Sequence, residues 1–285
     1  MKTLYKILFI LSLIIYQAGY SQCWFSELIK DFDKNPAEFK EFMKTEPDAM
    51  YAYEQLYKAN KTGLRQNTKA LQAYSRTIKN AKLKELGFTD ELLAKLDGAA
   101  NLSYEDALNN INKFADNLSA KNIKVEDFNK LFAELYESGA KRDGANWIVK
   151  YIANNGDEFA NKTIKFEEYI NSELGGRFVD VTDISNQSKK IFYEFKSVQQ
   201  VPPGHFSEQF MKDLTNANSL DQIKWMFNGA KNPPNFKTNM LNAIDNLPLT
   251  DELATKFLKG IDNPTPKMLK KHLKDNFDNI FKLAN

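Results

Sequence analysis

Two short runs of β-branched and aromatic residues, at positions 177–181 and 192–197, constrain the fold of this chain more than any other feature. Such residues are enriched in strands, because their side chains pack well on a pleated, half-buried surface. The polar stretch 185–190 separates the two runs and contains residue types that form turns. The sequence therefore predicts a β-hairpin in this part of the chain.

The predicted hairpin gathers charged side chains on one surface. Because side chains alternate between the two faces of a strand, Glu194 and Lys196 should point the same way. Asp180 stands between Val179 and Val181, so it should leave its strand on the face opposite to those valines. Two carboxylates and one amine on one face of a small sheet can hold a divalent metal ion and a phosphate.

Composition narrows the classes of protein that fit this chain. Its 285 residues suffice for one large domain or two small ones, and its 42% hydrophobic and 27% charged residues are ordinary for a globular protein. The single cysteine, Cys23, excludes an internal disulfide, and the only histidines are His205 and His272. Zinc ribbons, zinc hydrolases with an HExxH motif and nucleases that use several histidines are therefore disfavoured.

Residues 1–21 have the pattern of a secretory signal. Lys2 and Lys6 precede an apolar run at 7–15, which is short for a membrane span, and small residues follow it. We expect cleavage before Gln22 and a mature protein that is periplasmic or secreted. Losing both lysines, with no acidic residue in the segment, takes the formal charge from +2 to 0. Nucleic-acid binding by the mature chain would then depend on local patches rather than on an overall basic field.

Two other interpretations of the N-terminus stay open. The apolar run could act as an uncleaved membrane anchor, or the chain could be a lipoprotein modified at Cys23. Gln22 stands where a lipidation signal prefers a small residue, and the apolar run is short. We therefore expect a cleaved signal and no stable membrane insertion after cleavage.

After the signal, the chain is predicted to have two parts. Residues 22–138 carry apolar positions at helical spacing among charged residues, which predicts a helical region. This region contains neither metal-ligand spacing nor a glycine-rich phosphate loop, so its role is unassigned. Gly139 and Gly144 interrupt the helical pattern and mark the boundary to residues 139–285.

The second part combines the hairpin with helices. The pattern predicts one helix over 163–174, ahead of the first strand, and another over 206–214, after the second strand. Segment 220–227 fits either a short helix or a strand, and the pattern from Thr250 onward is a helical C-terminal extension. The fold class is therefore predicted to be α+β, with a helical N-terminal region and a mixed sheet flanked by helices.

The charged side chains of the hairpin match the needs of phosphodiester hydrolysis. A hard cation on the phosphate activates a water and neutralises the developing charge, and Mg²⁺ is usually held by a few carboxylate oxygens. A neighbouring lysine can position or deprotonate that water, or stabilise the transition state. Asp180, Glu194 and Lys196 supply these groups. The predicted helix before them adds a carboxylate from Glu167, with Glu173 as the alternative, so the sequence predicts a site for Mg²⁺ or Mn²⁺.

The order of these residues resembles the PD-(D/E)xK nuclease superfamily. Asp180 is followed by Glu194-Phe-Lys196 and then by a helix with the motif Phe-x-x-Gln209-Phe. This order is most similar to the restriction-endonuclease-like toxin modules at the C-termini of bacterial polymorphic toxins, over roughly residues 145–235. Val179 stands where the superfamily motif has a proline.

The resemblance implies a restriction-endonuclease-like mixed sheet and metal-dependent cleavage of DNA or RNA. It implies metal ligands at Asp180, Glu194 and Glu167, a catalytic lysine at Lys196 and a supporting amide at Gln209. It also implies a neutralising immunity protein as a partner, beside the nucleic-acid substrate itself.

Two alternatives to an active nuclease remain open. Glu194 and Lys196 could form a simple ion pair on a half-buried sheet, in an exported helical binding protein whose sheet is only structural. The second part could also be a nuclease-like domain that binds nucleic acid without cutting it. The sequence does not choose between DNA and RNA.

Overall fold

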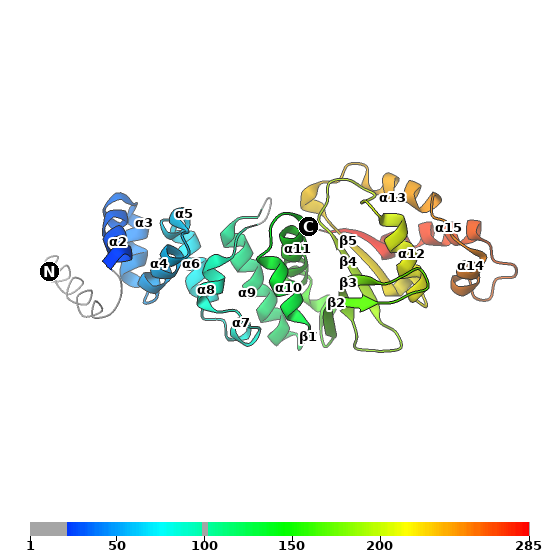
Figure 1. Cartoon of the computed structure of the whole chain (residues 1–285), viewed down its shortest axis with the longest axis horizontal. Coiled ribbons are helices and arrows are strands. Elements are labelled where there is room, and N and C mark those ends of the chain that lie inside the picture. Colours follow the sequence, from blue (N-terminus) through cyan, green and yellow to red (C-terminus); the bar gives the residue numbers. More distant parts are fainter. Residues whose placement is uncertain (1–21, 99–101, 285) are drawn as a thin grey trace. The chain divides into compact units, whose positions relative to one another are not determined.

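The computed structural model describes residues 22–98 and 102–284 (Figure 1). It contains a helical N-terminal region and a mixed β-sheet flanked by helices, which confirms the predicted α+β class. The chain divides into two compact units and passes between them more than once, because residues 80–88 belong to the second unit and 89–95 to the first. The predicted signal, residues 1–21, lies outside the described residues. In the part of the chain that is described, no helix has the length and apolar character needed to cross a membrane.

The described part of the first unit is built from helices alone. These are α2 (Gln22–Lys34), α3 (Ala37–Thr45), α4 (Ala49–Lys58), α5 (Thr62–Arg65), α6 (Thr68–Thr77) and α8 (Asp90–Lys95). Phe39 and Leu71 are fully buried between them. The buried carboxylate of Asp31 accepts hydrogen bonds from the Tyr53 hydroxyl (2.5 Å) and from Gln66 Nε2 (2.7 Å), so it is satisfied inside the helical core.

The second unit contains a six-stranded sheet in the order β1-β2-β3-β4-β5-β6. The strands are β1 (Lys124–Glu126), β2 (Thr163–Ile170), β3 (Arg177–Asp183), β4 (Ile191–Lys196), β5 (Ile223–Asn228) and β6 (Phe281–Ala284). The β2–β3 and β3–β4 pairs are antiparallel, and the other neighbouring pairs are parallel. The predicted hairpin is therefore confirmed as β3 and β4. Segment 220–227 forms the short 3-10 turn η3 (Leu220–Gln222) followed by a strand.

One face of the sheet is covered by α9 (Tyr104–Ala120), α10 (Phe128–Leu135) and α11 (Ala140–Asn154) (Figure 1). On this face Phe128 of α10 packs edge-on against Phe166 of β2, and Trp147 of α11 packs against Phe195 of β4. α7 (Ala81–Glu85) packs beside α9, and the turn η2 (Gly156–Phe159) leads from α11 to β2.

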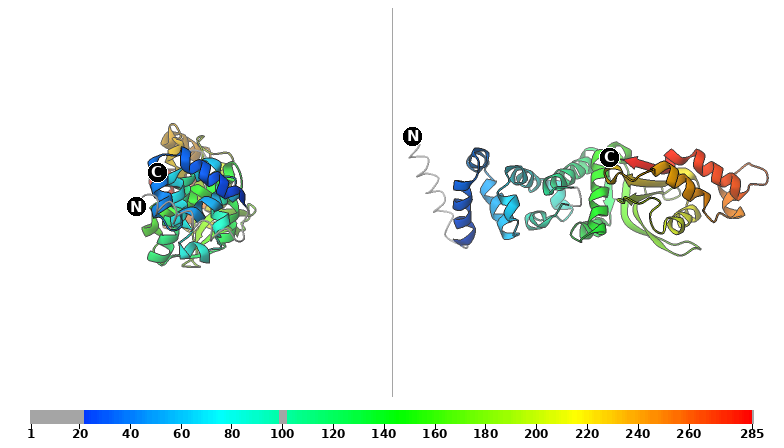
Figure 2. Two further views of the ribbon diagram at one scale, coloured as in Figure 1. Left: turned by 90° about the vertical axis from the view of Figure 1, so that its left-hand side faces the viewer. Right: turned by 90° about the horizontal axis from the view of Figure 1, so that it is seen from above.

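The opposite face is covered by the helices that follow β4 (Figure 2). They are α12 (Phe206–Asn216), α13 (Phe236–Asp245), α14 (Asp251–Phe257), α15 (Pro266–Asp275) and α16 (Phe277–Ile280), with the turn η4 (Gly229–Lys231) before α13. Phe206 and Phe210 of α12 pack on Trp225 of β5, with ring centroids 5.2 and 5.9 Å apart. The predicted helix over 206–214 is thus present as α12.

The predicted helix over 163–174 is wrong, because residues 163–170 form β2 and residues 171–176 form a loop. Ile164 and Phe166 are both fully buried, which is a period of two rather than the helical period. β-Branched and aromatic residues also dominate the segment and favour an extended chain. Gly175 has φ +92 in the loop, a conformation that glycine adopts without a steric cost.

The faces of β2 and β3 exchange in the middle of the pair. Phe166 and its partner Val181 face α10, whereas Val179 and Ile170 pack in the core under α12. Regular alternation would place Val179 and Val181 on one face, so the prediction that Asp180 points away from both valines is wrong. The reversal falls at Glu167 and Asp180.

Candidate active site

The structure brings together Asp180 of β3, Glu194 and Lys196 of β4, and Gln209 of α12, here called the β3–β4 cluster. Lys196 Nζ donates hydrogen bonds to Glu194 Oε1 (2.5 Å) and to Gln209 Oε1 (3.0 Å). The amide of Gln209 therefore fixes the lysine from the helix layer, while Glu194 fixes it within the strand. This is the arrangement that the sequence predicts for these residues.

Asp180 occupies a fork between two strands. The antiparallel ladder between β3 and β4 ends at the pair Val181–Tyr193, whereas the parallel pairing of β4 with β5 on its other edge runs on to Lys196. Asp180 is the first residue beyond the last pair, and its Oδ2 accepts a hydrogen bond from the backbone N–H of Phe195 (2.6 Å). The carboxylate thus satisfies a backbone donor that β3 no longer reaches, which fixes its position.

Glu167 lies on β2 rather than on a helix, so the prediction of a helix carboxylate is wrong in its element. The pairs Phe166–Val181 and Glu168–Val179 flank it, which places Glu167 directly across from Asp180 at an interruption of the ladder. Two carboxylates opposite each other on neighbouring strands repel.

The backbone of Glu167 is strained at this interruption, with φ +47. The other non-glycine residues with positive φ in the described chain are asparagine, aspartate or histidine, which tolerate this region better. Lys130 Nζ of α10 donates a hydrogen bond to the Glu167 carbonyl (3.0 Å) and helps to hold the kink. Strain of this kind persists where the surroundings enforce it and is concentrated at functional sites.

Burial and neighbouring carboxylates raise the pKa values of Asp180 and Glu167. Burial, followed by the charge of Glu194, raises the pKa of Asp180 well above its ordinary value, and Lys196 only partly opposes this. Burial, followed by the charges of Glu134 and Glu194, raises the pKa of Glu167 to about 7. Clustered carboxylates of this kind are unfavourable without a compensating cation.

Sequence reasoning missed Arg177 and Asp213, which form a second ion-pair layer under the β3–β4 cluster. Arg177 Nη2 donates to Glu194 Oε2, and its Nη1 lies 3.3 Å from Asp213 Oδ1. Burial raises the pKa of Asp213 to about 7, although the charge of Arg177 opposes the shift. Asp213 lies one helical turn after Gln209, so helical spacing was the signal that could have found it.

Trp225 of β5 also contributes to this layer. Its Nε1 donates to Asp213 Oδ2 (2.9 Å), and Lys196 Nζ lies 5.2 Å from the centre of its ring. The tryptophan therefore joins the apolar core to the charged layer, in addition to being fully buried. Its position opposite Glu194 in the β4–β5 register explains this contact.

The carboxylate oxygens of the candidate site are ligands of the kind that a hard cation prefers. In the described residues, no group of three or more His, Cys, Asp or Glu side chains is placed to hold a metal ion. Mg²⁺, however, usually takes one or two protein carboxylates and completes its shell with water and substrate phosphate. Asp180 and Glu194 fit that smaller demand, with Glu167 as a third carboxylate nearby, and a cation would relieve the raised pKa values of Asp180 and Glu167.

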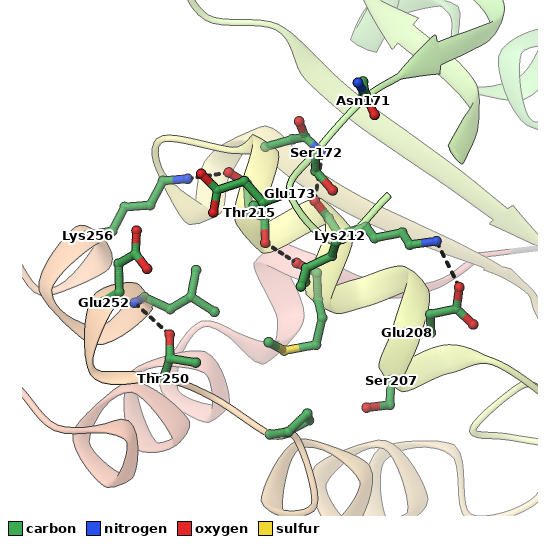
Figure 3. A pocket seen from close by; sticks show the side chains of 15 residues that line it. Asn171, Ser172, Glu173, Ser207, Glu208, Lys212, Thr215, Thr250, Glu252 and Lys256 are labelled. Atoms are coloured by element: carbon green, nitrogen blue, oxygen red, sulfur yellow. Dashed lines mark hydrogen bonds and ion pairs between the residues drawn. The ribbon is translucent and has the colours of Figure 1, made fainter. Parts of the chain in front are cut away.

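A separate pocket of about 920 Å³ lies along a different side of α12 (Figure 3). It is lined by the loop after β2, which includes Glu173, and by residues of α12 and α14 such as Lys212 and Lys256. Lys256 Nζ donates to the Thr215 carbonyl (2.6 Å), and Lys212 Nζ donates to Glu208 (2.8 Å). None of the residues of the β3–β4 cluster lines this pocket, so Glu173 lies in a different part of the surface from Asp180.

Comparisons with family models, with curated proteins and with solved structures find no match to this chain. What the protein does is therefore inferred from the side chains of the β3–β4 cluster and their surroundings.

Proposed function

We propose that the protein is a metal-dependent nuclease that hydrolyses phosphodiester bonds in DNA or RNA. The observation that carries this proposal is the β3–β4 cluster, in which Lys196 is hydrogen-bonded to both Glu194 and Gln209 while Asp180 is fixed at the strand fork. The order of these residues along the chain is also the order that suggests the PD-(D/E)xK superfamily. Export, a toxin role and an immunity protein belong to the same proposal.

Each residue has a distinct part in the proposed reaction. Asp180 and Glu194, with Glu167 beside them, would hold Mg²⁺ or Mn²⁺, and the bound ion supplies charge neutralisation at the phosphate and an acidic water. Lys196, which is hydrogen-bonded to Glu194, would orient the attacking water and stabilise negative charge as it develops. Gln209 keeps the lysine directed at the carboxylates, and Arg177 anchors the far oxygen of Glu194.

One observation favours a second candidate, an inactive or purely structural site. Both oxygens of Glu194 already contact cationic groups, Oε1 with Lys196 and Oε2 with Arg177. A buried, internally balanced ion-pair network of this kind needs no metal ion. It would suit an exported binding protein, or a nuclease-like domain that binds nucleic acid without cutting it.

A cleavage assay with matched variants separates these candidates. The chain from Gln22 onward would be incubated with plasmid DNA and with total RNA, in Mg²⁺, in Mn²⁺ and in chelator. We expect metal-dependent cleavage that falls by at least about a hundredfold in Asp180→Asn and in Lys196→Met, because each removes a group that acts on the phosphate or its water.

The matched control is Lys237→Met, which removes an exposed lysine paired with Asp278 and should leave cleavage unchanged. Cleavage that persists in both cluster variants would contradict the assignment of the site. Absence of cleavage by a correctly folded wild-type protein, with no stabilisation by either metal ion, would favour the structural candidate.

A further inference from the structure

An exposed aromatic pair lies beside the candidate site, at the outer end of β2 and β3. Tyr169 and Phe178 are 58% and 57% exposed, and they face each other across the two strands with ring centroids 5.2 Å apart. Most large rings of the second unit are buried in the cores on the two faces of the sheet. Two neighbouring rings that remain in solvent therefore form a surface that can bind a flat apolar partner.

The pair is tied to the candidate site through the strands themselves. Tyr169 is two residues from Glu167, and Phe178 is two residues from Asp180, so each ring starts about 6–7 Å along its strand from a cluster carboxylate. The exchange of faces at Glu167 and Asp180 sends Ile170 under α12 and leaves the two rings outside. The same kink thus determines the positions of both the carboxylates and the aromatic pair.

The ring of Tyr169 is held in place by Gly176. A Cβ atom at position 176 would lie 1.9 Å from the Tyr169 hydroxyl, so the ring packs directly on the glycine backbone. A ring fixed in this way loses little conformational freedom on binding, which favours affinity.

Lysines from both helix layers reach the same two strands. Lys130 Nζ of α10 is bonded to the Glu167 carbonyl (3.0 Å), and Lys212 Nζ of α12 is bonded to the Gly176 carbonyl (3.4 Å). Each carbonyl lies two residues before one ring of the pair, Tyr169 or Phe178. A polyanion that follows β3 would therefore meet Lys212, then Phe178 and then Asp180. Lys130 lies at the level of the β3–β4 cluster itself, and the two lysines are also paired with Glu208 and Asp127.

We propose that Tyr169 and Phe178 stack on an unpaired base of the nucleic-acid substrate and so place a neighbouring phosphodiester at the β3–β4 cluster. This inference rests on the proposed function and adds the substrate class, which is single-stranded or locally unpaired DNA or RNA. Bases in a duplex are stacked on each other and do not offer a free π-face, whereas every unpaired base does.

The competing explanation is that the rings only stabilise the pairing of β2 with β3. Aromatic pairs directly opposite each other stabilise antiparallel strands, and this pair could do nothing more. The test must therefore remove the aromatic faces while it keeps strand-forming side chains at both positions. Tyr169→Val with Phe178→Val meets this requirement, because valine favours strands and has no π-face.

Binding would be measured in chelator, so that cleavage does not interfere. Fluorescently labelled octanucleotides of DNA and RNA, single-stranded and as duplexes, would be titrated with the chain from Gln22 onward. We expect single strands to bind more tightly than duplexes, and the double variant to lose about tenfold or more in single-strand affinity. Replacing one base at a time by an abasic site should weaken wild-type binding at one or two positions and leave the double variant unaffected.

Two controls keep the test decisive. Ile261→Ala removes another exposed apolar side chain of the second unit, 45% exposed, and should bind as the wild type does. If the double variant melts at a lower temperature, the single variant Phe178→Leu, which keeps most of the apolar area, replaces it.

Equal affinity in wild type and folded variants, equal affinity for single strands and duplexes, or no binding to any oligonucleotide would each overturn the stacking proposal. Its failure is distinct from failure of the nuclease proposal. Cleavage without a role for the rings would leave the nuclease standing alone, and ring-dependent binding without metal-dependent cleavage would leave only the stacking surface.

Discussion

At the scale of single residues, the most informative group is the carboxyl of Glu167. Its position could not be predicted, because the helical spacing of residues 163–174 placed it on the wrong element. Its role as a third carboxylate beside Asp180 and Glu194 stays a prediction of the sequence. The rise of its pKa to about 7 comes first from burial, which no sequence pattern reports.

This pKa makes the stability of the metal-free protein depend on pH. Between the ordinary glutamate pKa of 4.5 and about 7, folded protein holds a proton at Glu167 that the unfolded chain has lost, so stability falls as pH rises through this window. Asp213, whose pKa is also raised to about 7, acts in the same direction. We expect the melting temperature in chelator to be several degrees higher at pH 5 than at pH 8, at about 2–4 °C per kcal/mol.

Glu167→Gln should reduce this difference without abolishing it, because Asp213 still titrates. Mn²⁺ should raise the melting temperature most at pH 8, where the carboxylates are ionised and bind the ion. Melting curves of both proteins at the two pH values check this, and an unchanged slope in the variant would contradict the assignment of the shift to Glu167.

At the scale of secondary-structure elements, the kink in β2 predicts a conflict between stability and activity. A glutamate at φ +47 costs about 1–3 kcal/mol, and asparagine tolerates this conformation better. Glu167→Asn should therefore be as stable as the wild type or more stable by about 1 kcal/mol, while it loses most of the proposed cleavage. Chemical denaturation in chelator, together with the cleavage assay, measures both effects. A clearly destabilised variant would show that the kink carries no strain.

Asp213, a buried carboxylate of α12, bonds the helix to both β3 and β5, which predicts a graded response to substitution. Asp213→Ala leaves the guanidinium of Arg177 and the Nε1 of Trp225 without this acceptor, and we expect a loss of about 3–5 kcal/mol. Asp213→Asn keeps an oxygen for Trp225 and should cost less. Urea denaturation of the two variants tests the order, and equal losses would show that the tryptophan hydrogen bond contributes nothing.

The sequence predicts best those elements whose apolar pattern fits either a helix or a strand but not both. The hairpin β3–β4 and helix α12 were predicted because residue type, spacing and turn chemistry agree there. β2 was missed because Phe166, Tyr169 and Ile170 fit a helical stripe, although Ile164 and Phe166 also fit a strand. The segment forms a strand because it pairs with both β1 and β3 in the sheet. Local periodicity does not report such tertiary pairing.

At the scale of the whole molecule, the sheet draws on residues well before the predicted boundary at position 139. β1 pairs with Thr163 to Lys165 of β2, and Phe128 of α10 packs on both Phe114 of α9 and Phe166. A strand of three residues is too short to produce a recognisable pattern, so its place in the sheet could not be predicted.

This organisation predicts which fragments can fold. Residues 139–285 alone lack β1, α9 and α10 and keep only α11 on that side, so they expose part of one face of the sheet and should be unfolded or aggregated. Residues 80–285 keep the whole second unit and should retain the native spectrum and the proposed cleavage. Circular dichroism and limited proteolysis compare the two fragments. A stably folded 139–285 fragment would show that the first helix layer is dispensable.

The hydrogen bond between Asp180 and the backbone of Phe195 has a consequence for the ancestry of the chain. An aspartate that closes a gap in the sheet would be retained by selection for folding alone, even in descendants that had lost all enzymatic activity. Lys196 makes no comparable bond to the backbone, since its hydrogen bonds go to the side chains of Glu194 and Gln209. In a set of related sequences, decay of function would therefore show first at the lysine, and the aspartate would persist as a relic.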